Sequence, residues 1–416
     1  MSTTPAPVIA TKPRKVNVRT PEVMARVQEQ VETHYRSTIV ERLRKAGGVI
    51  TVGNTTIRLA RQFGFCYGVE RAIDLAYAAR KVFGDQRLFL LGEIIHNPEV
   101  NRQLSDMDIL MLHNPPTEEE FADLLPDDIV IIPAFGATTA IMQRINERGC
   151  RTVDTTCGDV MSVWRRVREY ARRGLTSIIH GKAAHEETRA TASRAQGDDG
   201  MGNYLIILTL ADADAVCDYI RHGGDKDSFL KRFAGAYSPG FNPEIHLKRI
   251  GVANQTTMLK SETEELQGRL RQAITDRDGN ALALENFSVF DTICGATQER
   301  QDALYEMLKQ PMDLLLVVGG YNSSNTTHLV EIAEEYLPTF FIKDSSCLKS
   351  LEEIIHFDLH SRSEQSTANY SGILMGDGPV TIGITAGASC PNNLIEETIL
   401  RLFGLRGISA DQVLAV

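Results

Sequence analysis

From residue 61 onward, short apolar runs alternate along the chain with longer amphipathic stretches. The apolar runs are four or five residues long and rich in β-branched residues, which is typical of strands buried on both faces of a parallel sheet. The stretches between them have the length and period of crossover helices. The predicted strands are 87–91, 129–132, 176–180, 204–208, 250–253, 314–318, 339–342 and 380–384, and the predicted helices are 138–149, 159–172, 261–275, 298–309, 326–336 and 391–403. The pattern therefore predicts an α/β protein.

The first sixty residues follow a different pattern. Residues 21–46 predict one charged helix, which ends at Gly47-Gly48 because glycine favours the end of a helix. Residues 49–52 and 55–59 flank a Gly-Asn pair and predict a β-hairpin. We interpret residues 1–60 as an N-terminal extension packed outside the rest of the fold.

A short cysteine-containing motif occurs twice in the chain. Asp-Thr-Thr-Cys-Gly at 154–158 is matched by Asp-Thr-Ile-Cys-Gly at 291–295, and both follow a β-branched run and precede a helical stretch. Cys66 lies in a similar place before a predicted helix. One cysteine thus belongs to each of three similar modules. The expected division is an extension (1–60), module 1 with Cys66 (61–150), module 2 with Cys157 (151–285), module 3 with Cys294 (286–390) and a C-terminal helix and tail (391–416).

Composition narrows the class of protein. A length of 416 residues agrees with about three domains, and the net charge of 44 − 54 = −10 argues against nucleic acid as a partner. No apolar run approaches the roughly 18 residues of a membrane span, so we expect no membrane association. Seven scattered cysteines indicate a reducing compartment. We expect a cytoplasmic protein; if residues 1–20, which are basic, are a transit-peptide remnant and not a disordered tail, the alternative is the plastid stroma.

The placement of three cysteines indicates a metal centre. Cys66, Cys157 and Cys294 each stand between a strand end and a helix start, and a helix N-terminus stabilises the thiolate that binds metal. Zinc held by three cysteines and a histidine is one possibility, although zinc ligands usually come in close pairs. Ligands from three modules better suit an iron–sulfur cluster with one open iron that acts as a Lewis acid. Cysteines without this placement are predicted to be buried core residues: Cys150, Cys217 and Cys347.

Three further loops between a strand and a helix carry hydroxyl and amide groups. They are 255–257 (Gln-Thr-Thr), 322–325 (Asn-Ser-Ser-Asn) and 385–389 (Thr-Ala-Gly-Ala-Ser). Ligands of parallel sheets bind beyond the carboxyl ends of strands, and helix N-termini attract anions. The alternative is that these side chains only cap helices. No nucleotide P-loop and no clean G-x-G-x-x-G motif is present.

Histidine and carboxylate groups follow two other strands. His96 comes after the strand 87–91, and His185 and Glu187 come after the strand 176–180. A histidine can contact phosphate, and a glutamate beside an open metal can relay a proton. Taken singly, each of the three also fits an ordinary loop residue.

Together these segments resemble the IspH/LytB family of 4-hydroxy-3-methylbut-2-enyl diphosphate reductases from about residue 61 to residue 403. The resemblance implies three αβα modules around a pseudo-threefold axis, with a central 4Fe–4S cluster that has three cysteine ligands and one open iron. The motifs that carry it occur in the family's order: Gly64-Phe65-Cys66-x-Gly68-Val69-x-Arg71-Ala72-Ile73, His96-Asn97, Thr156-Cys157, His185-x-Glu187, Gln255-Thr256-Thr257, Ile293-Cys294-x-Ala296-Thr297, Asn322-Ser323-Ser324-Asn325 and Thr385-Ala386-Gly387-Ala388-Ser389.

The same resemblance implies roles for the site residues. The cluster ligands are Cys66, Cys157 and Cys294, and Glu187 and Thr256 stand near the allylic hydroxyl of the substrate. The reaction is a two-electron reductive dehydroxylation that yields isopentenyl diphosphate and dimethylallyl diphosphate, the last step of the non-mevalonate pathway. The implied electron donor is reduced ferredoxin or flavodoxin, and we expect a monomer or homodimer. The residues implied to hold the diphosphate are His96, His185, Ser323, Asn325 and Ser389, with Ser324 alongside.

One loop departs from the pattern of many family members, which carry a phosphate-binding histidine in a Ser-Ala-His-Gly-like sequence. Here the loop contains Phe135, which cannot donate a hydrogen bond, so we expect Thr138 to compensate or the phosphate clamp to be weaker. This loop, the extension and the elaboration at 195–248 are similar to the branch found in oxygenic phototrophs. Because ferredoxin is acidic, a docking site would need a local basic patch, and the candidates are Arg165, Arg166, Arg168, Arg172 and Arg173.

Two other classes of protein compete with this interpretation. Another three-cysteine 4Fe–4S enzyme, of the dehydratase or quinolinate synthase type, would require arginines that bind carboxylate. A non-catalytic cluster protein would leave Glu187, Thr256 and Ser389 without a role.

Overall fold

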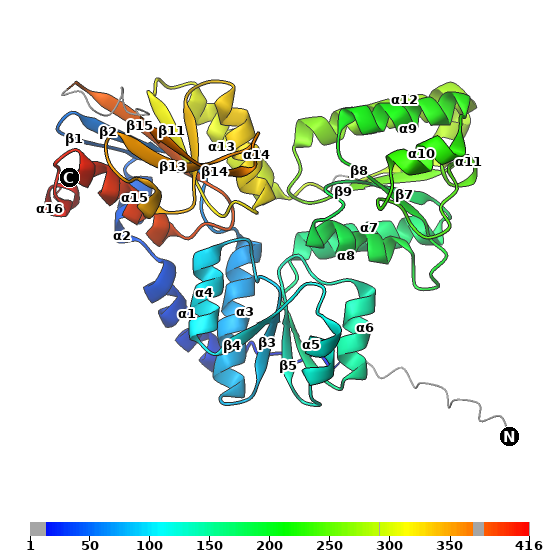
Figure 1. The fold of residues 1–416 in the computed structure, drawn as a ribbon, viewed down its shortest axis with the longest axis horizontal. Coiled ribbons are helices and arrows are strands. Elements are labelled where there is room, and N and C mark those ends of the chain that lie inside the picture. The colour runs from blue at the N-terminus through cyan, green and yellow to red at the C-terminus, as the bar shows by residue number, and fades with distance from the viewer. Residues whose placement is uncertain (1–13, 291, 369–377, 416) are drawn as a thin grey trace.

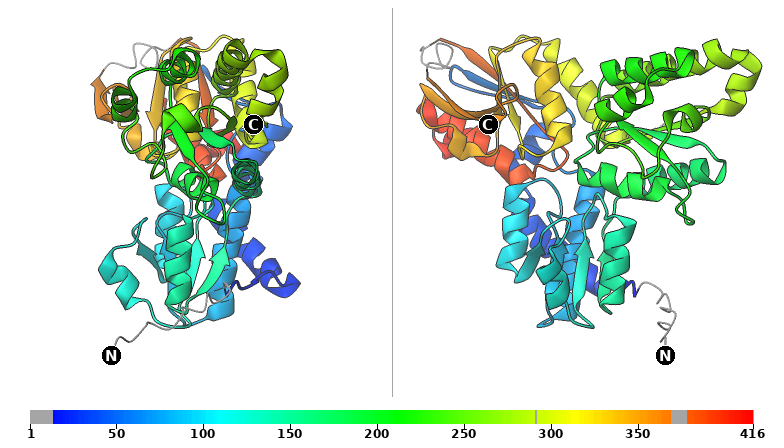
Figure 2. Two further views of the ribbon diagram at one scale, coloured as in Figure 1. Left: turned by 90° about the vertical axis from the view of Figure 1, so that its right-hand side faces the viewer. Right: turned by 45° about the vertical axis from the view of Figure 1, so that its right-hand side comes forward.

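The protein forms three lobes around a common centre. This computed structural model describes residues 14–290, 292–368 and 378–415; most of the basic tail and Asp291 lie outside that range. Each lobe is a largely parallel sheet with helices on its faces (Figure 1), and the view turned by 45° shows the same three bodies (Figure 2). The α/β prediction is therefore confirmed. No helix of the described part combines the length and the apolarity needed to cross a membrane.

The first lobe has the parallel sheet order β4–β3–β5–β6. In β3, Leu88 and Leu90 pack in the core shared with α3 and α4, whereas Phe89 and Leu91 pack in the core shared with α5 and α6. Both faces are buried, which explains the continuous apolar run. The elements are α3 (Tyr67–Phe83), β3 (Leu88–Leu91), α4 (Pro98–Asp106), β4 (Ile109–Leu112), α5 (Glu118–Asp123), β5 (Ile129–Ile132), α6 (Thr139–Glu147) and β6 (Arg151–Asp154).

The second lobe has the parallel order β10–β9–β7–β8. Helices α7 and α8 cover one face of the sheet, and α9 and α12 cover the other (Figure 1). The stretch 195–248 supplies β8 and α9, so it is part of this core. The elements are α7 (Gly158–Arg172), β7 (Thr176–His180), α8 (Glu186–Ala195), β8 (Tyr204–Ile207), α9 (Leu210–His222), α10 (Lys226–Arg232), α11 (Pro243–His246), β9 (Ile250–Asn254), α12 (Lys260–Asn286) and β10 (Phe287–Val289).

The third lobe has the order β1–β2–β15–β11–β12, in which only the β1–β2 pair is antiparallel. A separate hairpin, β13–β14, lies beside it. The elements are β1 (Val49–Val52), β2 (Thr55–Leu59), α13 (Gly295–Leu308), β11 (Leu314–Val318), α14 (Ser324–Glu334), β12 (Thr339–Ile342), a 3-10 turn (Ser345–Cys347), β13 (Glu353–Asp358), β14 (Ser363–Ala368), β15 (Val380–Ala386), α15 (Asn392–Leu405) and α16 (Ala410–Leu414).

The N-terminal segment differs from the predicted outer extension. The stretch 21–46 is two helices, α1 (Pro21–Tyr35) and α2 (Thr38–Lys45), because Ser37 caps α2 by accepting the backbone N–H of Val40. Helix α1 packs on the core of the first lobe and α2 on that of the third. The hairpin completes the third sheet, where Ile57 is fully buried opposite Ile382.

Two of the expected module boundaries differ from the boundaries of the observed sheets. Strand β6, which we expected in module 2, belongs to the first sheet, and β10, which we expected in module 3, belongs to the second. The reason is that the chain finishes one sheet before it crosses to the next lobe. Each candidate cysteine lies on such a crossing: Cys66 between β2 and α3, Cys157 between β6 and α7, and Cys294 between β10 and α13.

Candidate active site at the centre of the lobes

The three crossings bring the candidate cysteines to one cavity. Cys66, Cys157 and Cys294 are the N-cap residues of α3, α7 and α13, and none of these caps is made by a side-chain hydrogen bond. The cavity holds about 720 Å³ of unfilled space, part of it open to solvent. Every residue predicted for the site lines it: the three cysteines, His96, His185, Glu187, Thr256, Ser323, Ser324, Asn325 and Ser389.

The sulfur atoms of Cys66 and Cys157 both lie near Gly68, and that of Cys294 contacts helix α7. A Cβ atom at Gly68 would lie 2.5 Å from Sγ of Cys157, which is too close, and 3.9 Å from Sγ of Cys66, so glycine at this position leaves room for the sulfur of Cys157. The thiol of Cys294 donates a hydrogen bond to Oδ2 of Asp159 at 2.9 Å. All three cysteines are free and partly exposed, whereas Cys150, Cys217 and Cys347 are buried as predicted, each no more than 2% exposed.

The electrostatics of these thiols suit a metal centre. Burial raises the pKa of Cys157, although the backbone N–H of Asp159 at the start of α7 lowers it. Burial, and then the hydrogen bond to Asp159, raise the pKa of Cys294 to about 12. Thiolates at these positions therefore need a nearby positive charge, and a metal ion supplies it. Free, convergent cysteines at helix N-termini are thus a donor set that fits an iron–sulfur cluster.

Beside the cysteines, Glu187 is held by Thr256. The carboxylate is 3% exposed and accepts the backbone N–H of Thr256 at 2.6 Å and its hydroxyl at 2.9 Å. Burial raises the pKa of Glu187 to about 7, against the lowering effect of the two Thr256 hydrogen bonds. The carbonyl of Thr256 in turn accepts the backbone N–H of Cys294 at 3.2 Å. A carboxyl group with this pKa can donate a proton near neutral pH.

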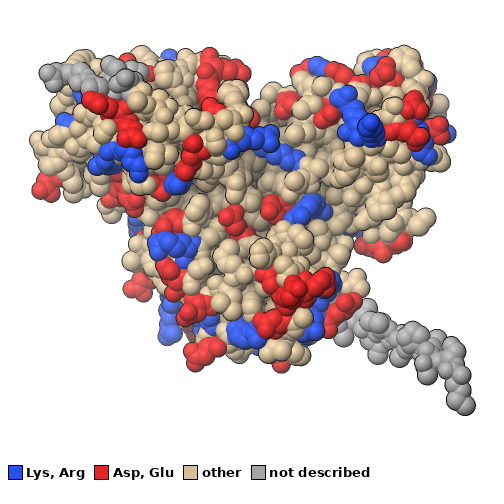
Figure 3. Space-filling model, in the orientation of Figure 1, with Lys and Arg blue, Asp and Glu red and all other residues tan. Residues whose placement is uncertain are grey.

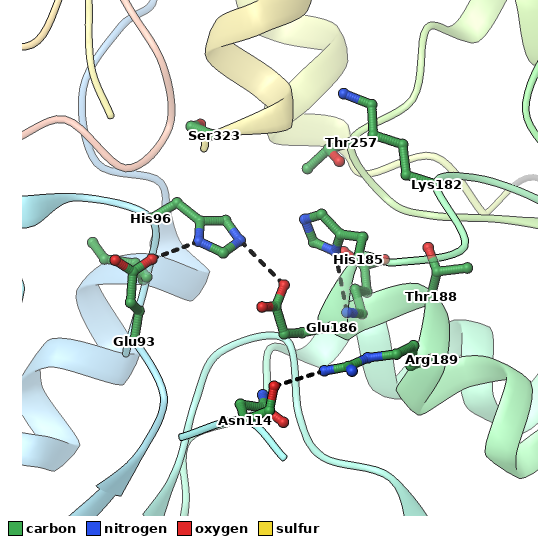
Figure 4. A network of polar contacts seen from close by, with 12 residues as sticks. Glu93, His96, Asn114, Lys182, His185, Glu186, Thr188, Arg189, Thr257 and Ser323 are labelled. Carbon is green, nitrogen blue, oxygen red and sulfur yellow. Dashed lines mark hydrogen bonds and ion pairs between the residues drawn. The ribbon is translucent and has the colours of Figure 1, made fainter. Parts of the chain in front are cut away.

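Two histidines, His96 and His185, face the cavity, and contacts within the protein fix the orientation of their rings (Figure 4). Nδ1 of His185 accepts the backbone N–H of Glu187 at 3.1 Å, so its neutral tautomer carries the proton on Nε2. Burial lowers the pKa of His185 to about 3, and the ring is therefore a neutral donor. Nδ1 of His96 lies 2.8 Å from a carboxylate oxygen of Glu93. Nε2 of His96 is buried without a hydrogen-bond partner in the described part of the chain and lies 3.7 Å from Glu186.

The loops of the third lobe add further donors. Ser323 caps α14, and Ser389 donates its hydroxyl to the backbone carbonyl of His96 at 3.2 Å. Oδ1 of Asn325 accepts the backbone N–H of Ala388 at 2.9 Å. Nδ2 of Asn325 and the hydroxyl of Ser324 are buried, and neither has a partner among the described residues. Buried donors without partners in the protein are available to a ligand, and here they lie at the N-terminus of a helix, where anions bind.

Phe135 stands where many family members have a phosphate-binding histidine, and it contacts His96. Its ring stacks on that of His96, with centroids 4.6 Å apart and planes 15° apart. Thr138 does not line the cavity, and its hydroxyl accepts the backbone N–H of Ile141 at the start of α6, so the expectation that Thr138 replaces the missing donor is wrong. Phe135 instead orients His96.

Sequence reasoning missed three acidic residues of the site. Asp159 bonds to Cys294, Glu93 holds His96, and Glu186 lies opposite His96. Glu93 and His96 lie in the loop between β3 and α4, where no regular spacing marks a contacting pair. Asp159 and Glu186 look like ordinary acids in the first turn of a helix, so only the fold reveals their contacts.

Part of the charge of the candidate basic patch is paired with acidic residues. Arg166 and Arg173 both pair with Glu169, and Arg172 pairs with Asp198. In the view of Figure 3, basic and acidic residues lie interspersed over the surface. Two acidic residues thus pair with three of the five candidate arginines, and the docking role of this patch stays a prediction.

Comparison with known proteins agrees with this geometry. The family model described as "LytB protein" matches residues 57–403. The 4-hydroxy-3-methylbut-2-enyl diphosphate reductase of Gloeobacter violaceus is 46% identical, over 92% of this chain and 91% of its own length. The enzyme of the same name from Thermosynechococcus vestitus is also 46% identical, over 92% of this chain and 93% of its own length.

Solved structures share the fold. A structure of (E)-4-hydroxy-3-methyl-but-2-enyl diphosphate reductase, described as the terminal enzyme of the non-mevalonate pathway, aligns with a TM-score of 0.51 and 24% identity over 84% of this chain and 99% of that chain. The E-1-hydroxy-2-methyl-but-2-enyl-4-diphosphate reductase of Plasmodium falciparum aligns with a TM-score of 0.59 and 20% identity, over 82% of this chain and 86% of that one. The extent of the family match and the identity to these relatives establish that this chain belongs to the LytB protein family.

Proposed function

We propose that this chain is an oxidoreductase that converts (E)-4-hydroxy-3-methylbut-2-enyl diphosphate into isopentenyl diphosphate and dimethylallyl diphosphate. Relatives of this name cover almost the whole chain. The observation that carries the proposal is that one cavity is lined both by buried donors without partners among the described residues and by three free cysteines. The reaction consumes two electrons and two protons and releases water.

The donor side suits the diphosphate. His96, His185, Ser324 and Asn325 present ring, hydroxyl and amide donors from all three lobes, and Ser323 and Ser389 lie beside them. Binding of this non-reacting group orients the allylic alcohol toward the cysteines. No arginine lines the described cavity, so a carboxylate substrate, as in the dehydratase or quinolinate synthase alternative, is less well served.

The cysteine side suits the cofactor. Cys66, Cys157 and Cys294 would hold a 4Fe–4S cluster with one iron left without a protein ligand. When bound, such a cluster supplies electrons one at a time and a Lewis acid for the alcohol oxygen. Reduced ferredoxin or flavodoxin would serve as the donor of these electrons.

The proton for the leaving hydroxyl comes from Glu187. Its carboxyl group has a pKa of about 7, so a substantial fraction is protonated at neutral pH. Thr256 holds it against the cavity wall and can pass the proton through its own hydroxyl. The second proton reaches either end of the allylic carbon chain, which yields the two product isomers.

The test is anaerobic purification followed by iron analysis and turnover with dithionite. The Cys157→Ala protein should lose iron and activity together, whereas Cys217→Ala, which changes a buried cysteine far from the cavity, should keep its iron. Wild-type protein that binds no iron, or that binds iron and leaves the allylic diphosphate unchanged, would refute the proposal.

A further inference from the structure

Arg300 links two of the cysteine loops. It lies in α13 and is 4% exposed. Its Nη1 donates to the carbonyl of Ala296 at 2.8 Å, and its Nη2 donates to the carbonyl of Gly64 at 2.6 Å. Ala296 comes two residues after Cys294, and Gly64 comes two residues before Cys66. One guanidinium group therefore connects two lobe crossings, and its contact with Gly64 joins residues that are 236 positions apart in sequence.

The receiving loop is built for this contact. Gly64 has a φ of +82°, which favours glycine, and a Cβ atom there would lie 2.8 Å from Oδ1 of Asn392. Arg44 donates from Nη2 to the carbonyl of the preceding residue, Phe63, at 2.7 Å. The loop before Cys66 is thus held by two arginines, of which only Arg300 is buried.

The charge of Arg300 is not neutralised by its hydrogen bonds. Both acceptors are uncharged carbonyl groups, and Nε is buried with no partner in the described part of the chain. Burial lowers the pKa of Arg300, and among the groups that oppose this effect Cys66 and Cys294 come first, ahead of Glu299 and Glu70. A buried cation is costly unless an anion compensates it. The cysteine sulfurs are the principal candidates for that anion.

We propose that Arg300 is a positioning residue whose fixed positive charge stabilises the reduced state of the metal centre held by Cys66 and Cys294. This inference rests on the proposed function, since it presupposes the cluster. Each electron that enters the centre adds one negative charge. A nearby cation in a partly buried site stabilises the reduced, more negative centre more strongly than the oxidised one. It thereby raises the reduction potential of the centre.

The test separates charge from hydrogen bonding. Arg300→Gln removes the charge, whereas Arg300→Lys keeps it and loses the two-pronged link. Arg44→Gln is the matched control, because it removes a hydrogen bond to the same loop, and the charges around Arg44 are carboxylates and Arg300, not cysteine. The midpoint potential of the anaerobically reconstituted proteins is measured by redox titration followed by electron paramagnetic resonance, with iron and sulfide content determined in parallel.

We expect a more negative potential in Arg300→Gln, a value close to wild type in Arg300→Lys and no shift in Arg44→Gln. Iron-loaded Arg300→Gln protein with the wild-type potential would overturn the inference, and so would equal shifts in Gln and Lys variants. If Arg300→Gln takes up no iron, the Arg300→Lys protein decides the question. Iron uptake with the wild-type potential supports the role of charge, whereas a failure of Arg300→Lys to take up iron overturns the inference. Wild-type protein that takes up no iron would refute the proposed function itself.

Discussion

Thr256 binds both oxygens of the Glu187 carboxylate, one through its backbone N–H at 2.6 Å and the other through its hydroxyl at 2.9 Å. The two residues come from different crossovers of the second lobe, after β9 and at the start of α8. Both hydrogen bonds lower the pKa of Glu187, and burial raises it to about 7. The pair therefore controls how much of the carboxyl group is protonated at neutral pH.

Replacement of Thr256 by valine should move the pH profile of kcat/KM. Loss of the hydroxyl removes one interaction that lowers the pKa of Glu187, so this pKa should rise above about 7. Because Glu187 acts in its protonated form, activity falls as pH rises through its pKa, and this fall should occur at higher pH in the variant. The control is Thr257→Val, whose hydroxyl accepts from Gln255 and does not bond to Glu187. An unchanged inflection in Thr256→Val would contradict this coupling.

Glu187→Gln should keep the cofactor and lose turnover. An amide of the same size preserves the packing but has no proton to donate, and general acid catalysis typically contributes about 10²–10⁴-fold. We expect iron content near that of wild type and a loss of kcat within that range. Full activity in iron-loaded Glu187→Gln would remove this residue from the proton path.

The same carboxyl group should make stability depend on pH. The pKa of Glu187 is raised from 4.5 to about 7 on folding, so its burial is tolerated at low pH and becomes destabilising as pH rises from about 4.5 to 7. At about 1.4 kcal/mol per pH unit, the loss reaches at most roughly 3–4 kcal/mol. Chemical denaturation of cluster-free protein at pH 5 and pH 8 should show a larger decrease for wild type than for Glu187→Gln; equal decreases would exclude a raised pKa.

Glu186 and Glu93 should affect diphosphate binding in opposite directions. Glu186 lies 3.7 Å from Nε2 of His96, where an incoming phosphate oxygen meets a like charge. Glu186→Gln should thus tighten binding by about fivefold, since such a repulsion is worth about 1 kcal/mol in a solvated site. Glu93 orients the ring through Nδ1, and Glu93→Gln should weaken binding. Calorimetric titration with inorganic diphosphate measures both changes, and a common direction would contradict the geometry.

Ser323 and Ser324 are adjacent, but we expect Ser324 to affect only substrate binding and Ser323 to affect stability as well. The hydroxyl of Ser324 has no partner in the described part of the chain, so Ser324→Ala should raise KM by about tenfold or more, the effect of a lost hydrogen bond to a charged group, with no loss of stability. Ser323 caps α14, and Ser323→Ala should also lower the free energy of unfolding by about 1 kcal/mol. Measurement of KM and of urea denaturation on both variants checks the distinction, which fails if Ser324→Ala is the less stable protein.

Local patterns were sufficient for much of this protein. The strand Leu314–Val318 has the predicted bounds, because a continuous apolar run specifies a doubly buried strand with little help from distant residues. The repeated Asp-Thr-x-Cys-Gly sequences indicated cysteines at helix starts, which the structure places at the N-caps of α7 and α13. In each case the determining residues are neighbours in the chain.

The misplaced elements depend on partners far away in sequence. The hairpin β1–β2 was recognisable, but its position was not, since β2 pairs with β15 more than 300 residues later. The contacts of Arg300, Asp159 and Glu186 are hidden for the same reason, because a charged residue on a helix usually faces solvent.

The sequence alone thus determined the central strands, several crossover helices, the cysteine loops and the family resemblance, since these follow from short-range patterns of apolar residues and motifs. Only the tertiary structure decided that each cysteine lies on a crossing between lobes, that Phe135 stacks on His96, and that Arg300 joins two of the crossings. Those relationships arise when three separately buried cores pack against one another, and no local stretch of the chain encodes them.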